Sequence, residues 1–177
     1  MILKDNIVIS ENSDSSLVLR NIEQKDQNML RQWKNKNRDY FFFKDEINAE
    51  MQQIWFEKYL NDSNNFLFAV EYNMTLIGCM GFKVTPEGAD VYNIILGNDS
   101  FAKSGIMSKA MKIMCSYILE IGIDKVFLKV LQSNKIAYEW YLKNSFSKKY
   151  SSEDYHFLEL DMKNFDRCKI DIVCKNA

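Results

Sequence analysis

The residues around Gly105 have the types and spacing of an anion-binding turn. An apolar run over residues 91–96, VYNIIL, is followed by small and polar residues and then, from Gly105, by an apolar-faced helical pattern that ends near Gly122. The first turn of a helix leaves backbone N–H groups without intrahelical partners, and the helix dipole adds about half a positive charge there. A phosphate can bind at such a helix start, although the same pattern can also serve only to connect two core elements.

A second group of candidate residues follows the next apolar run, KVFLKVL over 125–131. Asn134 precedes a short helical pattern, and Tyr141 lies seven residues further on, two turns away on nearly the same helix face. A phenol has an ordinary pKa of about 10, so it is protonated at neutral pH and can donate a proton. Asn134 could equally cap the helix, and Tyr141 could be a core aromatic residue.

Together, the two segments resemble the GNAT superfamily of acyl-CoA-dependent N-acyltransferases. Members of that family carry Asn-x-x-Ala-x-x-x-Tyr-x-x-x-Gly-Phe, which this chain matches at Asn134, Ala137 and Tyr141, with Ser145-Phe146 in place of Gly-Phe. The family's tyrosine at this position is the usual proton donor to the departing thiolate. The resemblance therefore implies that Tyr141 is catalytic.

The family also carries a Gln/Arg-x-x-Gly-x-Gly/Ala loop that binds the coenzyme A pyrophosphate. Gly105 keeps its place in this loop, whereas Ala102 replaces Gln/Arg and Met107 replaces Gly/Ala. The resemblance implies that loop amides bind the pyrophosphate, with hydroxyl donors and a lysine charge beside them. It also implies that amides of the preceding strand bind the thioester carbonyl and pantetheine, if a bulge or splay leaves them unpaired. The implied coenzyme-binding residues are Ile94, Ile95, Leu96, Ala102, Lys103, Ser104, Gly105, Ile106, Met107, Ser108, Asn134 and Ala137.

The resemblance places the acceptor-binding residues in the first half of the chain, which is the variable part of the family. The run RDYFFFKD over 38–45 holds four aromatic residues between charges, and the resemblance gives this connection the role of lining the acceptor pocket. Alternatively, the aromatic residues plug the core under the helices. The general base stays open between Asp90, Glu71, a water relay and the single histidine, His156, and each carboxylate also fits a solvated charge. The expected substrate-binding residues are Tyr40, Phe41, Phe42 and Glu71.

The hydrophobic patterns predict one α+β domain over 1–177, with a mixed, mostly antiparallel sheet of six or seven strands flanked by about four helices. A tight hairpin is expected at Asn73-Met74. Residues 1–16 could hold a short strand, and residues 163–177 could add an edge strand or pack as a tail. Helical patterns occupy residues 23–35, 47–60, 105–122 and 134–144, and strand patterns occupy 17–22, 66–72, 75–84, 89–97, 125–131, 146–150 and 155–162.

The composition of the chain argues against several classes of binding partner. The 177 residues have a formal net charge of −1 with basic residues spread along the chain, so neither nucleic acid nor an anionic membrane is an expected partner. Four scattered cysteines and one histidine argue against a zinc site and against a disulfide framework, and no metal is expected. The N-terminus has no signal-peptide pattern and the chain has no 18-residue apolar stretch, so we expect a cytoplasmic protein without a membrane span.

The leading functional hypothesis is an N-acetyltransferase that moves an acetyl group from acetyl-CoA to a primary amine by direct attack. The first half is similar to GNAT members that acetylate amino-sugar nucleotides, and to others that acetylate the N-termini of ribosomal proteins. A small-molecule amine is favoured because no strongly acidic groove for a basic protein is visible in the sequence. A catalytically weakened binding or regulatory module with the same fold is the alternative that Ala102 and Met107 favour. A monomer and a homodimer are both compatible with the sequence.

Overall fold

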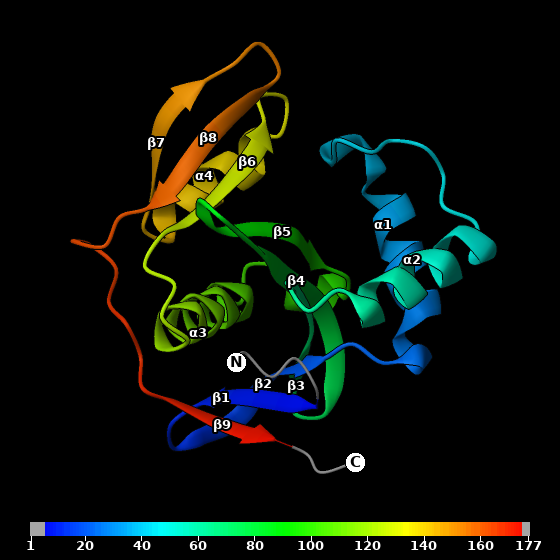
Figure 1. The fold of residues 1–177 in the computed structure, drawn as a ribbon, viewed down its shortest axis with the longest axis horizontal. Helices are drawn as coiled ribbons and strands as arrows, with labels where there is room; N and C mark the ends of the chain where they lie inside the picture. Colours follow the sequence, from blue (N-terminus) through cyan, green and yellow to red (C-terminus); the bar gives the residue numbers. More distant parts are fainter. Residues whose placement is uncertain (1–5, 175–177) are drawn as a thin grey trace.

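A single mixed sheet organises residues 6–174, the part of the chain that the computed structural model describes (Figure 1). In these residues the sheet has nine strands in the order β7-β8-β6-β5-β4-β3-β2-β1-β9. Every neighbouring pair is antiparallel except β5 and β6, which run parallel. The strands are β1 Ile7–Glu11, β2 Asp14–Asn21, β3 Asn65–Tyr72, β4 Thr75–Thr85, β5 Gly88–Leu96, β6 Val126–Leu131, β7 Phe146–Ser151, β8 Tyr155–Leu160 and β9 Ile170–Cys174.

The predicted α+β class is confirmed, but the expected count of six or seven strands is wrong. The two additional strands are β1 and β9, which are five residues each and pair with one another at one edge of the sheet. Strands this short give little periodic signal, and their pairing joins opposite ends of the chain. The edge-strand alternative for the C-terminal tail is therefore correct for residues 170–174. Residues 1–5 and 175–177 of the predicted domain lie outside the described part.

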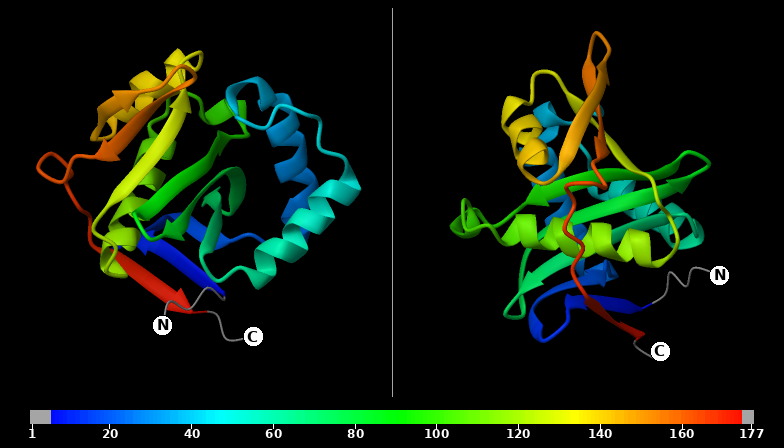
Figure 2. Two further views of the ribbon diagram at one scale, coloured as in Figure 1. Left: turned by 45° about the horizontal axis from the view of Figure 1, so that its top comes forward. Right: turned by 90° about the vertical axis from the view of Figure 1, so that its left-hand side faces the viewer.

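Four α-helices of the described chain cover the sheet on both faces (Figure 2). Helices α3 and α4 pack in the larger core on one face, and α1 and α2 pack in a smaller core on the other. No helix in the described residues is both long and apolar enough to cross a membrane. The helices are α1 Gln27–Lys36, α2 Ala49–Asn61, α3 Ile106–Glu120 and α4 Lys135–Lys143.

Capping residues explain where these helices begin. The helical pattern from residue 23 begins as a 3-10 turn at Gln24–Asp26, with a capping box between Glu23 and Asp26, and becomes α-helical at Gln27. Helix α2 begins after Asn48, whose side chain accepts a hydrogen bond from the N–H of Met51 at 2.8 Å. Both helices therefore start a few residues later than the periodicity alone predicts.

The sheet divides where β5 meets β6. The two strands pair only at Ala89↔Val126 and Asp90↔Phe127, so beyond Asp90 the amides of β5 that point toward β6 have no strand partner. A β-bulge also interrupts the pairing of β5 with β4, because Asn93 and Ile94 both stand opposite Met80, and Asn93 has a φ of 51°. The bulge and splay that the GNAT resemblance requires are therefore present.

Helix α1 lies directly against the end of β5. A Cβ atom built on Gly97 would be 1.9 Å from the indole ring of Trp33, so only glycine allows this approach. Trp33 itself is buried, in the smaller core with Ile95 of β5. This packing fixes the C-terminal half of α1 beside the bulge.

A long irregular segment, residues 161–169, returns the chain from β8 to β9. It crosses α3, where the N–H of Cys168 donates to the Ser116 hydroxyl at 3.1 Å and Lys112 Nζ lies 2.8 Å from an Asp166 carboxylate oxygen. Phe165 packs against the larger core. The segment thereby joins the β6–β8 part of the sheet to the β1 edge.

Candidate active site

The turn before α3 is built as an open anion site. Gly105 is the N-cap residue, with φ 81° and ψ −2°, a left-handed conformation that favours glycine. The first helical hydrogen bond runs from Lys109 N–H to the Gly105 carbonyl at 3.1 Å. In the described chain, no acceptor faces the N–H groups of Gly105, Met107 and Ser108. Apart from its two chain neighbours, no heavy atom of the described residues lies within 4 Å of a Cβ built on Gly105, so the space beside this residue is open.

The two serine hydroxyls beside this turn have different roles. The Ser104 hydroxyl donates to the Phe101 carbonyl at 2.6 Å and accepts from Ile106 N–H at 3.3 Å, so its hydrogen is used within the loop. The Ser108 hydroxyl accepts from the indole N–H of Trp140 at 3.1 Å and keeps its own hydrogen. Of the two expected hydroxyl donors, only Ser108 retains a free hydrogen. Its contact with Trp140 also fixes α4 against the start of α3.

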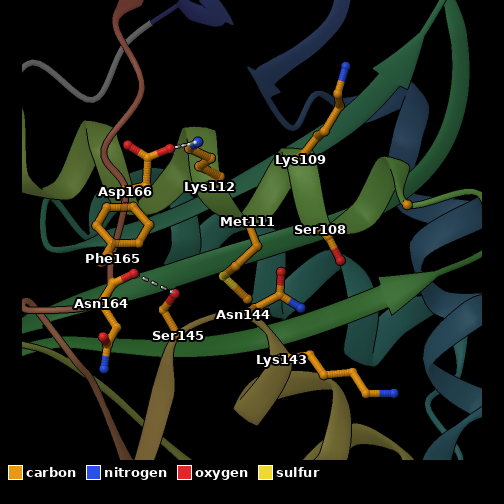
Figure 3. Close-up of a pocket in the computed structure, with 11 residues that line it drawn as sticks. Ser108, Lys109, Met111, Lys112, Lys143, Asn144, Ser145, Asn164, Phe165 and Asp166 are labelled. Carbon is orange, nitrogen blue, oxygen red and sulfur yellow. Dashed lines mark hydrogen bonds and ion pairs between the residues drawn. The ribbon is translucent and has the colours of Figure 1, made fainter.

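A hollow of about 300 Å³ begins at this turn (Figure 3). It extends from Gly105 and Ser108 between α3 and the end of α4 to residues 164–166. Asn144 and Ser145 line its α4 side, and Lys112 enters its wall already paired with Asp166. The free amides of the turn therefore border a space large enough for part of a nucleotide.

The side chain of Tyr141 meets two conditions for a proton donor. It is half-buried, with ring contacts to Trp140 and Phe146, and burial raises the pKa of its phenol, which stays protonated at neutral pH. Its hydroxyl makes no hydrogen bond within the described residues, yet no fully buried side-chain oxygen there lacks a partner. The hydroxyl oxygen is therefore not fully buried, although Tyr141 is not among the residues that line the hollow beside the Gly105 turn.

The Asn134 side chain accepts a hydrogen bond from Ala137 N–H at 3.2 Å. Its carbonyl oxygen thus caps α4, which leaves its amide N–H₂ group as the part free to contact a ligand. The hydrogen bond between Asn134 and Ala137 therefore fixes the start of the helix that carries Tyr141.

The aromatic segment between α1 and α2 is largely on the surface. Tyr40 and Phe42 are 50% and 56% exposed, so these two do not plug the core. Phe42 contacts Tyr155 of β8 edge-on, at 6.0 Å between ring centroids. The segment therefore reaches across from the α1–α2 side to the β6–β8 part of the sheet.

The candidate bases lie in three separate places. Glu71, on β3 two strands from β5, is held by Arg20, whose Nε lies 2.7 Å from a Glu71 carboxylate oxygen. Asp90 is half-buried at the closed end of the splay, and burial raises its pKa. His156 accepts or donates a 2.8 Å hydrogen bond with Ser151. Glu71 therefore belongs to a structural ion pair, and the structure does not bring it to the β5 bulge.

Arg20 is the centre of that ion pair. Its side chain is buried and binds Asp26 with two hydrogen bonds, of 2.7 and 2.9 Å, in addition to Glu71. Asp26 also accepts from the N–H of Glu23 at 2.7 Å. The network fixes the start of α1 to strands β2 and β3.

Sequence reasoning missed two residues at the bulge. Lys34 of α1 donates to the Asn93 side-chain oxygen at 2.5 Å, and its ammonium lies 3.4 Å from the centroid of the Phe41 ring. One signal was present, because Lys34 follows Leu30 by four residues and so places a charge on the apolar face of an amphipathic helix.

Comparisons with known proteins agree with this fold. A family model described as an acetyltransferase (GNAT) domain matches residues 16–147. A comparison with curated proteins gives no match. Among solved structures, the chain is similar to a spermidine N-acetyltransferase from Vibrio cholerae in complex with CoA and spermine. That pair has 18% identity and a TM-score of 0.71, over 86% of this chain and 99% of the other.

Two further structures share the fold. RimL, a ribosomal L7/L12 alpha-N-protein acetyltransferase, has 17% identity and a TM-score of 0.68 over 86% of this chain and 91% of its own. The Campylobacter jejuni N-acetyltransferase PseH has 19% identity and a TM-score of 0.64 over 83% of this chain and 99% of its own. The matched family region contains both the Gly105 turn and the helix of Tyr141. The chain therefore belongs to the GNAT family of acetyltransferases, which transfer acyl groups from acyl-CoA to amines.

Proposed function

We propose that this chain transfers an acetyl group from acetyl-CoA to the primary amine of a small molecule, such as an amino-sugar nucleotide. The observation that carries the proposal is the presence of free amides at the Gly105 turn together with a protonated Tyr141 hydroxyl that has no hydrogen-bond partner within the described residues. The amides would bind a pyrophosphate, and the hydroxyl would donate a proton to a departing thiolate. The cytoplasmic location and the monomeric or homodimeric state remain predictions from the sequence.

The residues of the turn fit the coenzyme's charge. The amides of Gly105, Met107 and Ser108 would bind the pyrophosphate, and the Ser108 hydroxyl and the exposed Lys103 would add a donor and a charge. The hollow beside them would take part of the nucleotide. Ala102 lacks the side-chain donor of the family's Gln/Arg, whereas the Met107 side chain is buried and its backbone N–H is kept, so the donors of the site would be mainly backbone groups.

The chemistry follows from the bulge and the phenol. Unpaired β5 amides near Asn93 and Ile94 would polarise the thioester carbonyl as the neutral amine attacks it. A carbon–nitrogen bond forms and the carbon–sulfur bond breaks. Tyr141 donates its proton to the departing sulfur, and the amine loses a proton to a base or to water.

The first test is coenzyme binding. At about 100 times its dissociation constant, acetyl-CoA should raise the free energy of unfolding by about 2.7 kcal/mol. For a chain of this size the melting temperature should rise by about 5–11 °C, measured by thermal shift. No shift with millimolar acetyl-CoA, together with no thiol release in a panel of amines, would instead favour a binding or regulatory module.

The second test separates the turn from the fold. Gly105→Ala should weaken acetyl-CoA binding by about tenfold or more, measured by titration, because alanine disfavours a φ of +81° and would redirect the free amides. Gly122→Ala is the matched control, since Gly122 lies just past the other end of α3 with a φ of +87° and equally open space. Both variants should lose about 1–2 kcal/mol of stability. Equal coenzyme affinity in the two variants would remove the turn from the coenzyme site.

A further inference from the structure

Lys34 carries a positive charge that the described protein does not neutralise. Its ammonium is half-buried between the Asn93 side-chain oxygen at 2.5 Å and the ring of Phe41 at 3.4 Å, two neutral groups. No carboxylate in the described chain forms an ion pair with it. By contrast Lys36, two residues on, is exposed and lies 2.9 Å from Asp99.

Holding a cation in this way costs free energy. Desolvation lowers the pKa of Lys34 to about 8, so at pH 7 most of the molecules still carry the charge. The face of Phe41 attracts a cation but does not cancel its charge. An unpaired charge that the fold maintains at such a position is typical of a functional site whose ligand supplies the opposite charge.

The position of Lys34 relates it to the acceptor side of the proposed reaction. The Gly105 turn and Tyr141 belong to α3 and α4 on one face of the sheet, whereas Lys34 belongs to α1 on the opposite face. Lys34 binds Asn93, the residue of the β5 bulge whose neighbouring amides would hold the thioester carbonyl. An amine that attacks this carbonyl from the α1 side would bring its own substituents next to Lys34.

We propose that Lys34 selects acceptors that carry an oxyanion, a phosphate or a carboxylate, close to the reacting amine, and disfavours polyamines. This inference rests on the proposed acetyl transfer. The half-desolvated ammonium pairs with an anion more strongly than a surface lysine does, and it repels a second ammonium group on the acceptor. Lys34 is thus a specificity-determining residue.

The test compares acceptors that differ in charge. With acetyl-CoA, the protein should acetylate O-phosphoethanolamine and β-alanine with a kcat/KM at least about tenfold above that for ethanolamine or spermidine. The two anionic acceptors distinguish phosphate from carboxylate. Lys34→Met, which keeps the length of the side chain, should lower kcat/KM for the anionic acceptors only, so that the preference disappears. Lys34→Gln serves the same purpose should the methionine variant fail to fold.

Lys36→Met is the control, because it removes the same charge from the same helix at an exposed site, and it should keep the preference. The inference is overturned if the wild-type protein acetylates spermidine or ethanolamine as well as the anionic amines. Survival of the preference in Lys34→Met, or its loss in Lys36→Met, would overturn it too.

A binding measurement decides the inference separately from catalysis. In the CoA-saturated protein, the side-chain NMR signal that Lys34→Met removes should shift with O-phosphoethanolamine and not with ethanolamine. If no amine releases thiol, the proposed acetyl transfer fails, and this signal alone decides whether Lys34 binds an oxyanion. An unchanged signal overturns the Lys34 assignment.

Discussion

Replacing Tyr141 with phenylalanine should lower kcat for acetyl transfer by about two to four orders of magnitude. The substitution removes the hydroxyl and keeps the ring contacts with Trp140 and Phe146. Because the hydroxyl makes no hydrogen bond within the described protein, its loss leaves no buried partner unsatisfied. Stability and acetyl-CoA affinity should therefore stay nearly unchanged. A thiol-release assay with saturating substrates measures kcat, and a melting curve checks the fold.

Tyr138→Phe provides the matched control for this variant. Tyr138 lies three residues earlier on the same helix, and its ring contacts His156 at 4.6 Å between centroids. It loses the same atom without a place in the proposed chemistry, so its kcat should remain within about twofold of the wild-type value. If Tyr141→Phe also retained full kcat, Tyr141 would not be the proton donor.

Asp26→Asn should lower the free energy of unfolding by about 3 kcal/mol. The substitution nearly preserves the shape of the side chain but removes its charge, so the buried guanidinium of Arg20 loses the carboxylate that binds it through two hydrogen bonds. Burial makes this loss large, because water cannot replace the missing partner. Urea unfolding, with the m-value checked to be constant, measures the effect.

Asp99→Asn breaks an ion pair of similar length at the surface. Lys36 and Asp99 are both exposed and lie 2.9 Å apart, so the loss should be less than about 1 kcal/mol. Comparable losses in the two aspartate variants would mean that burial of Arg20 does not determine the strength of its ion pairs.

Local sequence patterns predicted those parts of the candidate site whose geometry depends on residues close together in the sequence. Gly105 marks a left-handed turn before a helix, and the spacing of Asn134 and Tyr141 is that of a capped helix. In both cases the residues that set the geometry are within one or two helical turns of each other. The motif match could therefore place the turn and the phenol before the fold was known.

The missing parts of the site depend on contacts between distant strands. The bulge at Asn93 arises from the register of β5 against β4, and no glycine or proline in the run VYNIIL marks it. Glu71 was a candidate base because it lies at the end of a strand pattern, and its ion pair with Arg20 could not be predicted because the two residues are 51 positions apart. Lys34 lies beside the bulge on a helix whose Trp33 packs against Gly97, 64 residues later in the sequence. The bulge and the Arg20–Glu71 ion pair have no local signature, and the local signal of Lys34, a charge on the apolar face of its helix, does not show which residue it contacts.

The path of residues 161–169 has a mechanical consequence for ligand exchange. The two parts of the described sheet, β7-β8-β6 and β5-β4-β3-β2-β1-β9, share only two residue pairs, between β5 and β6. Residues 161–169 cross α3 and end in β9, which pairs with β1 in the second part. This segment thus connects the two parts of the sheet at a second place. Widening the gap between β5 and β6 would strain this second connection. A pantetheine arm should therefore enter a gap of nearly constant width.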